Sequence, residues 1–190
     1  PRVQRLAVLL LASLGFGAGI AAAIWSMGLM PGWGSGAVRS ELPQISGDFS
    51  LVDEQGKSVH WNALGNRLQL VFFGFLNCPE VCPSTLTAAA AGLRSLGDEG
   101  AALRLLLISV DPERDTPQAL RSYTAAFSPW VIGFTGSDEQ IEAAAAAFGV
   151  FYEKMPPMGA ADDYMVNHTA SLFLLGPRNE ILEIIPYGAS

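Results

Sequence analysis

Both cysteines of the 190-residue chain fall in one short window, in which Cys78 and Cys82 are separated by three residues. The window follows an apolar run and is followed by Pro83, a residue typical of the first turn of a helix. In helix-like chain, positions i and i+4 lie on one side about 6 Å apart, so these thiols could form a disulfide or bind one metal ion. A position at a helix start also predicts thiolate character for Cys82. The alternatives are a purely structural disulfide or two inert buried thiols.

The spacing of these cysteines is one residue longer than the C-x-x-C spacing of thiol–disulfide exchange. The longer spacing fits chelation of a soft metal at least as well, because thiolates favour Cu(I) while imidazole accepts Cu(I) and Cu(II). The next question is therefore whether the chain offers a third ligand.

Alternating strands and helices must position these residues. Continuous apolar runs predict buried strands at Leu68–Leu76 and Ala102–Val110, and a further strand is expected at Trp130–Phe134. Prolines and hydroxyl residues predict the helix starts, including a capping box that opens at Ser137. The remaining predicted elements are strands at 49–53 and 58–60, helices at 82–96, 116–127 and 137–148, and a hairpin of 169–175 with 180–185. This order is typical of an α/β fold, a thioredoxin-like sandwich.

The chain has two histidines, which differ in their surroundings. His60 lies among surface-like residues, and we interpret it as an ordinary solvent-facing side chain. His168 immediately precedes the predicted strand Thr169–Leu175, and in a thioredoxin-like topology the loop entering that strand lies across from the thiols. An imidazole there could reach the thiols; the alternative is a histidine that is hydrogen-bonded to backbone.

Two other groups of residues could carry chemistry. Met155, Met158 and Met165 precede His168 and are interpreted as loop packing, with transient Cu(I) binding as the alternative. The segment 109–117 holds three acids and an arginine and could form a hard-cation site. The favoured interpretation is a turn and helix entry, with Asp111 near the dithiol loop shaping contact with a partner.

An apolar segment of about 25 residues, Leu6–Met30, is long enough to cross a ~30 Å hydrocarbon core as a helix. It exceeds the ~7–15 residues of a signal-peptide core, so we expect an uncleaved transmembrane anchor. Arg2 and Arg5 precede it, which predicts a cytoplasmic N-terminus. We therefore expect a single-pass protein of a bacterial inner membrane with its soluble domain in the periplasm. The alternative is the mitochondrial inner membrane, facing the intermembrane space.

The predicted domains are a membrane anchor at residues 1–30, a linker at 31–47 and a thioredoxin-like domain at 48–190. Without Arg2 and Arg5, nine lysines and arginines remain against eighteen acids. This negative charge excludes a nucleic-acid-binding function, which needs positive charge to neutralise phosphates.

Three blocks, FGFLNCPEVCPSTL, SVDPERDTP and YMVNHT, resemble the Sco/SenC family of membrane-anchored copper chaperones for cytochrome c oxidase assembly. The resemblance runs from about Ile45 to Tyr187. It implies that Cys78, Cys82 and His168 bind copper, as Cu(I) or Cu(II), and that the partner is the oxidase subunit bearing the dinuclear copper centre.

The sequence departs from the usual pattern of that family at two places. Asn167 stands before the histidine where the family usually has aspartate, and Leu76-Asn77 stands where Thr-His is often found. If that aspartate helps to hold the imidazole, Asn167 weakens metal retention.

The leading interpretation is a copper metallochaperone with no catalytic turnover of its own. The alternative is a membrane-tethered thiol–disulfide reductase that acts on the cysteines of the oxidase subunit. A peroxiredoxin-like peroxidase is disfavoured because it needs an arginine-assisted pocket, and the nearest basic residue along the chain is Arg67, eleven positions before Cys78.

Overall fold

The computed structural model describes residues 45, 47–157, 159 and 164–189. The predicted anchor Leu6–Met30, most of the predicted linker and Met158 lie outside these residues. Among the described residues, no helix combines the length and the apolar character needed to cross a membrane.

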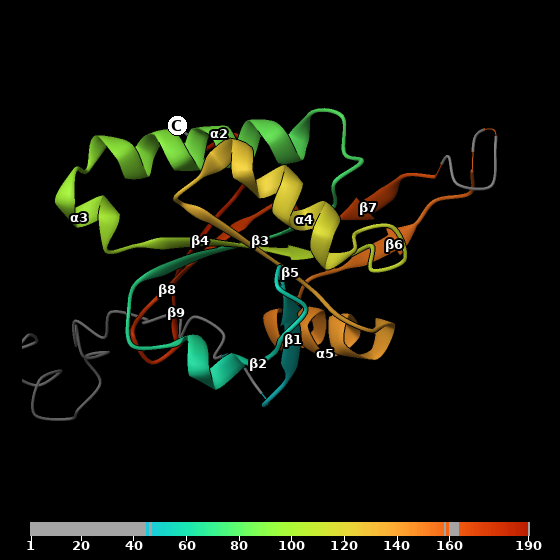
Figure 1. Ribbon diagram of the computed structural model, residues 1–190, viewed down its shortest axis with the longest axis horizontal. Coiled ribbons are helices and arrows are strands. Elements are labelled where there is room, and N and C mark those ends of the chain that lie inside the picture. Colours follow the sequence, from blue (N-terminus) through green and yellow to red (C-terminus); the bar gives the residue numbers. More distant parts are fainter. Residues whose placement is uncertain (1–44, 46, 158, 160–163, 190) are drawn as a thin grey trace, which may run out of the picture. The chain divides into compact units, whose positions relative to one another are not determined.

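The described part of the chain is built around a seven-stranded sheet in the order β2-β1-β5-β4-β3-β8-β9 (Figure 1). Its strands are β1 (Ser50–Asp53), β2 (Ser58–His60), β3 (Gln69–Gly74), β4 (Arg104–Ser109), β5 (Val131–Thr135), β8 (Leu172–Leu175) and β9 (Ile181–Ile185). The three central strands β3, β4 and β5 are parallel, whereas β1 and β8 run antiparallel to the neighbours on which they pack.

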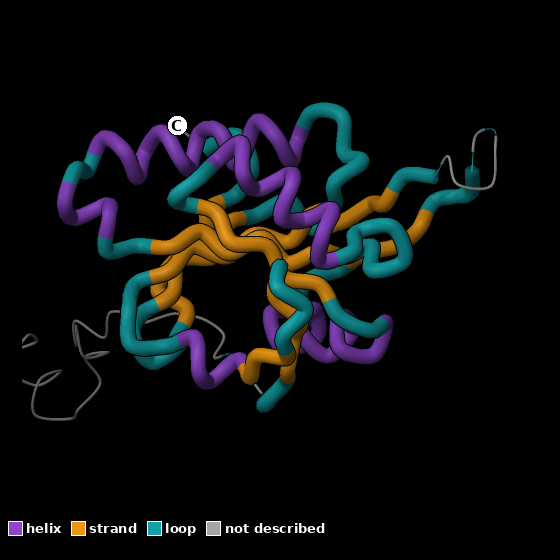
Figure 2. Tube along the Cα trace, viewed as in Figure 1, coloured by secondary structure: helices purple, strands orange, loops and turns teal. Residues whose placement is uncertain are grey.

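Helices cover both faces of this sheet, with α2 and α4 on one face and α5 on the other (Figures 1 and 2). The helical elements are α2 (Val81–Ser95), α3 (Asp98–Ala101), α4 (Pro117–Thr124) and α5 (Asp138–Phe148), with short 3-10 turns η1 (Trp61–Leu64) and η2 (Ala125–Phe127). The strand–helix alternation from β3 to β5 and the closing β8–β9 hairpin agree with the predicted α/β sandwich.

Side-chain caps fix two of the helix starts as the sequence predicts. Thr116 accepts a hydrogen bond from the backbone N–H of Ala119 at the start of α4, and proline occupies the first turn. Ser137 and Gln140 form the expected reciprocal capping box at the start of α5. Helix α2 begins at Val81 rather than at the cysteine, so Cys82 is its second residue.

The parallel register of β3 and β4 brings two functional loops together. Gly74 at the end of β3 pairs with Ser109 at the end of β4, and the next residue, Val110, donates a backbone hydrogen bond to Gly74 at 2.9 Å. Both strands are almost wholly buried, so their carboxyl ends are held in place by the surrounding core. The cysteine loop and the 109–117 segment therefore leave the sheet side by side.

A small hairpin of β6 (Tyr152–Lys154) and β7 (Val166–His168) was not among the predicted elements. It forms a two-stranded sheet of its own, at the end of the main sheet where the cysteine loop lies (Figure 1). The prediction of a strand over Thr169–Leu175 was wrong at its start, because β8 begins at Leu172 and His168 belongs to β7. Strands of three residues are too short to show a hydrophobic period.

Candidate metal centre

The two cysteines lie where β3 gives way to α2. Cys78 lies in the connecting loop and donates its backbone N–H to the carbonyl of Phe75 at 3.3 Å. The backbone N–H of Cys82 in turn donates to Cys78 Sγ, also at 3.3 Å. Both cysteines are buried free thiols, so this is the reduced form of the pair.

Gly74 lets the Cys82 sulfur lie against the end of β3. A Cβ atom added at this glycine would meet Cys82 Sγ at 3.0 Å and Cε1 of Phe72 at 2.9 Å. Sequence reasoning missed this role. The available signal was a glycine inside an otherwise continuous apolar strand, which often marks a close approach.

His168 approaches the dithiol from the β6–β7 hairpin. Its Nε2 lies 3.8 Å from Cys82 Sγ, and its ring packs edge-on against Phe72 and Phe75. Its Nδ1 lies 3.0 Å from the carbonyl oxygen of Thr169. Because a carbonyl can only accept, Nδ1 carries the proton, and the Nε2 lone pair faces the sulfur.

Burial controls the protonation of both groups. It raises the pKa of Cys82 well above the ordinary thiol value, and a backbone hydrogen bond from Phe75 only partly offsets this. The expectation that the helix start makes Cys82 a thiolate is therefore wrong for the metal-free protein, since Cys82 is only 1% exposed. Burial also lowers the pKa of His168, which favours the neutral ring that a metal needs.

The separation of Cys82 Sγ and His168 Nε2 fits shared binding of one ion. Typical bonds of about 2.3 Å from metal to sulfur and 2.0–2.1 Å to nitrogen, set at ~120°, place the donors about 3.8 Å apart. Within the described residues, however, no three His, Cys, Asp or Glu side chains already surround a common point. Cys78 is the candidate for the third donor, because it lines a cavity of about 290 Å³ together with His168.

A profile described as SCO1/SenC matches residues 37–190. The chain belongs to the SCO1/SenC family. The SCO2-like protein of Rickettsia conorii is 33% identical over 140 residues, which cover 74% of this chain and 68% of that one.

Solved structures of Sco proteins share the fold of this SCO1/SenC chain. Arabidopsis thaliana ScoI with copper bound is 35% identical, with a TM-score of 0.67 over 76% of this chain and 89% of that one. BsSco is 29% identical. It is described as a member of the Sco family of cytochrome c oxidase assembly proteins in which a disulfide switch has been identified. Its TM-score is 0.59, with 77% and 85% of the two chains covered. The predicted thioredoxin-like α/β fold is therefore confirmed.

The buried carboxylate of Asp115 is hydrogen-bonded to the start of the cysteine loop in this SCO1/SenC protein. Asp115 Oδ2 accepts hydrogen bonds from the backbone N–H of Leu76 at 3.1 Å and from the Ser109 hydroxyl at 2.6 Å. Burial raises the pKa of Asp115 to about 6, against the lowering effect of these donors. The sequence gives no signal of this contact beyond an acid that follows a buried strand.

The acids of the 109–117 segment do not form a hard-cation site. Asp111 and Asp115 are buried and bonded to protein donors, which confirms the interpretation as a turn and helix entry. The expectation that Asp111 shapes partner contact was wrong, because its side chain has no exposed surface.

The other candidate residues have the following positions. His60 is exposed, as interpreted, and lies 3.0 Å from the Ser50 hydroxyl. Met155 is exposed, whereas Met165 lines the cavity beside Cys78 and His168. Asn167 is exposed at the edge of the same cavity, and its predicted effect on metal retention stays a prediction.

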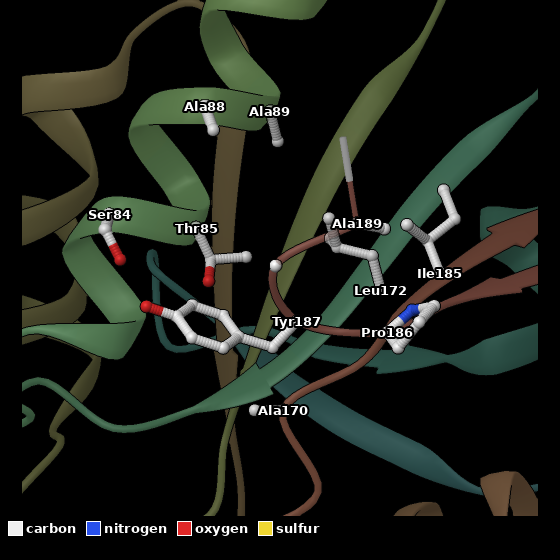
Figure 3. A pocket seen from close by; sticks show the side chains of 11 residues that line it. Ser84, Thr85, Ala88, Ala89, Ala170, Leu172, Ile185, Pro186, Tyr187 and Ala189 are labelled. Carbon is white, nitrogen blue, oxygen red and sulfur yellow. The ribbon is translucent and has the colours of Figure 1, made fainter.

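A second cavity, of about 260 Å³, lies between α2 and the ends of β8 and β9 (Figure 3). Its walls are mainly apolar, and the ring of Tyr187 extends toward Ser84 and Thr85 on the helix. It contains no thiol or imidazole, so it offers none of the soft donors of the cysteine site.

Proposed function

We propose that this protein binds one copper ion through Cys78, Cys82 and His168 and delivers it during assembly of a cytochrome c oxidase. The observation that carries the proposal is the approach of His168 Nε2 to Cys82 Sγ at 3.8 Å, with the imidazole tautomer fixed. Copper is the cargo of this activity, and the chain carries out no catalytic turnover.

The donor set suits a soft ion that must be held and then released. Two thiolates bind Cu(I) well, and the neutral imidazole serves either oxidation state. Cys82 and Cys78 lose their protons on binding, whereas His168 loses none because Nδ1 keeps its proton. Three protein donors leave room for a ligand from the acceptor, which can displace one donor during transfer.

The related structures support the copper and the partner. ScoI from Arabidopsis thaliana, 35% identical, is known with copper bound. BsSco is described as belonging to a family of cytochrome c oxidase assembly proteins. We infer that the acceptor is the oxidase subunit with the dinuclear copper centre, the partner that the resemblance to the Sco/SenC family implies.

We further propose that Leu6–Met30 anchors the protein in a membrane, with the copper-binding domain on the side opposite the cytoplasm. The proposal rests on the length of the apolar segment and on Arg2 and Arg5 before it. The site then faces the periplasm of a bacterium or the mitochondrial intermembrane space. Residues 31–47 act as the linker to the domain at 48–190.

The deciding experiment is copper binding by the reduced protein and by single variants. Cys78→Ser and Cys82→Ser are each expected to lose the bound equivalent on dialysis. His168→Ala is expected to weaken Cu(II) more than Cu(I), because two thiolates still satisfy the soft ion. His60→Ala is the matched control, since it changes the exposed histidine. Retention of a full equivalent by either serine variant refutes the proposal.

A thiol–disulfide reductase is the second candidate. It is favoured by the pair of free thiols joined through the Cys82 N–H at the helix start, and by the disulfide switch described for BsSco. The two candidates differ in their requirement for His168. Reduction of a disulfide substrate needs only the cysteines, so full reductase activity in His168→Ala with lost Cu(II) binding would separate the two.

A further inference from the structure

A half-buried cluster, centred on the buried Asp111, connects the loop after β4 to the hairpin that carries His168. Both carboxylate oxygens of Asp111 are used: Tyr164 donates its hydroxyl to Oδ1 at 2.6 Å, and Arg114 donates from Nε to Oδ2 at 2.5 Å. Arg114 also donates from Nη1 to the carbonyl oxygen of Tyr164 at 3.0 Å. Its guanidinium carbon lies 3.6 Å from the centre of the Tyr164 ring. Tyr164 is thus held through its hydroxyl, its ring and its backbone.

The position of Tyr164 makes this contact relevant to the metal site. It lies four residues before His168, just ahead of β7, and the next carbonyl, that of Met165, accepts from Met155 N at 2.8 Å. Among the described strands, β6 and β7 pair only with each other. Side-chain contacts such as those of Tyr164 must therefore hold the hairpin against the body of the protein.

The same loop also holds the other half of the site. Asp115 fixes the cysteine loop through Leu76, and Asp111 is tied to Asp115 by the hydrogen bond from Asp115 N to the Asp111 carbonyl at 2.9 Å. The Asp111 N–H donates to the Ser109 hydroxyl at 3.0 Å. One short, internally bonded loop is thus the common support of the thiols and of the imidazole.

We propose that Asp111 is a positioning residue that acts through Tyr164 and Arg114 to hold His168 at the distance from Cys82 that metal binding requires. The inference rests on the proposed function, since the group that is positioned is the proposed copper ligand. When the hairpin is released, only a fraction of molecules holds His168 in place, and the apparent affinity falls by that fraction.

The first test needs no metal and uses Tyr164→Phe, which removes the hydroxyl and keeps the ring beneath Arg114. The chain has only two histidines, so the imidazole signals in an NMR spectrum are those of His60 and His168. His168 lies 6.0 Å and 5.8 Å from the ring centres of Phe72 and Phe75, whose ring currents displace its signals. In the variant the His168 signals are expected to move toward those of an exposed imidazole, with His60 unchanged.

The second test is Cu(II) binding by the same variant. Loss of a hydrogen bond to a charged group is expected to weaken Cu(II) retention about tenfold. The stoichiometry stays at one, and the electron paramagnetic resonance spectrum shifts toward that of His168→Ala. Arg114→Lys keeps a positive charge beside Asp111 but gives up the planar fork that reaches Tyr164, and is expected to act in the same direction.

Glu153→Gln is the control on the same hairpin. Glu153 is an exposed residue of β6, where substitutions have little effect, so neither the His168 signals nor copper binding is expected to change. Unmoved His168 signals in Tyr164→Phe, or equal effects of Glu153→Gln, overturn the proposal. Failure of the parent protein to bind copper refutes the proposed function instead, and the metal-free spectra still decide whether Asp111 positions His168.

Discussion

Replacing Gly74 with alanine tests whether the end of β3 sets the position of the Cys82 sulfur. The new Cβ would lie 3.0 Å from Cys82 Sγ and 2.9 Å from Phe72 Cε1. Non-bonded heavy atoms pack best at about 3.5–4.0 Å, so the sulfur must move by roughly 0.5 Å or the strand must shift. Metal–ligand distances vary by only about 0.2 Å, so this displacement is large for a metal site. Overpacking of this kind costs about 1–3 kcal/mol of unfolding free energy.

The assay combines urea unfolding of the reduced, metal-free protein with a copper titration followed by the thiolate-to-Cu(II) absorption band. Gly74→Ala should be less stable by the stated amount and should show an altered band. Gly92→Ala is the matched control, because an added Cβ in α2 meets no atom within 4 Å. Alanine there should raise the stability by about 0.5–1 kcal/mol and leave copper binding unchanged. A Gly74→Ala protein with the parent's stability and absorption band refutes the reasoning.

Two further predictions concern protonation and oxidation. The pKa of Asp115, raised by burial from 3.8 to about 6, means that the folded protein binds this proton more tightly than the unfolded chain. The resulting stabilisation is complete below pH 3.8 and is lost as the pH rises through 6, which lowers the free energy of unfolding by about 3 kcal/mol. Urea unfolding of Asp115→Asn at a series of pH values should lack this part of the decline. Parallel pH profiles for the parent and the variant would contradict the prediction. A Cys78–Cys82 disulfide, verified by a mass two hydrogens lower, should abolish copper uptake because ligation needs deprotonated thiols. Equal uptake by the oxidised and reduced forms would show that the sulfurs are not the ligands.

The parts of the fold that the sequence predicts are those fixed by local patterns. The apolar runs of β3 and β4 predict the buried centre of the sheet, and the Ser137 capping box predicts the start of α5. The prediction that His168 faces the thiols also agrees with the structure, since topology places the strands of this fold in a known order. Only the element that carries the histidine differs, because β7 is three residues long.

The supporting residues of the site could not be found in this way. Tyr164 and Asp111 are 53 positions apart, and their hydrogen bond exists only because two loops meet at the end of the sheet. The charge state of Cys82 was mispredicted for a related reason. Its place at a helix start is visible in the sequence, whereas its burial, which is the main cause of its raised pKa, depends on the surrounding core.

Because the β6–β7 hairpin is a separate sheet, the rate of metal release and the thermal stability of the protein can vary independently. The strand pairings of the main sheet do not include β6 or β7, so opening of this hairpin would break none of those pairings, although it would expose the buried Val166. Such local openings have their own free energy, below that of global unfolding. If an ion bound at the proposed site leaves only when the hairpin opens, its residence time follows the rate of that opening. A substitution of an exposed hairpin residue would then shorten the residence time and leave the melting temperature unchanged.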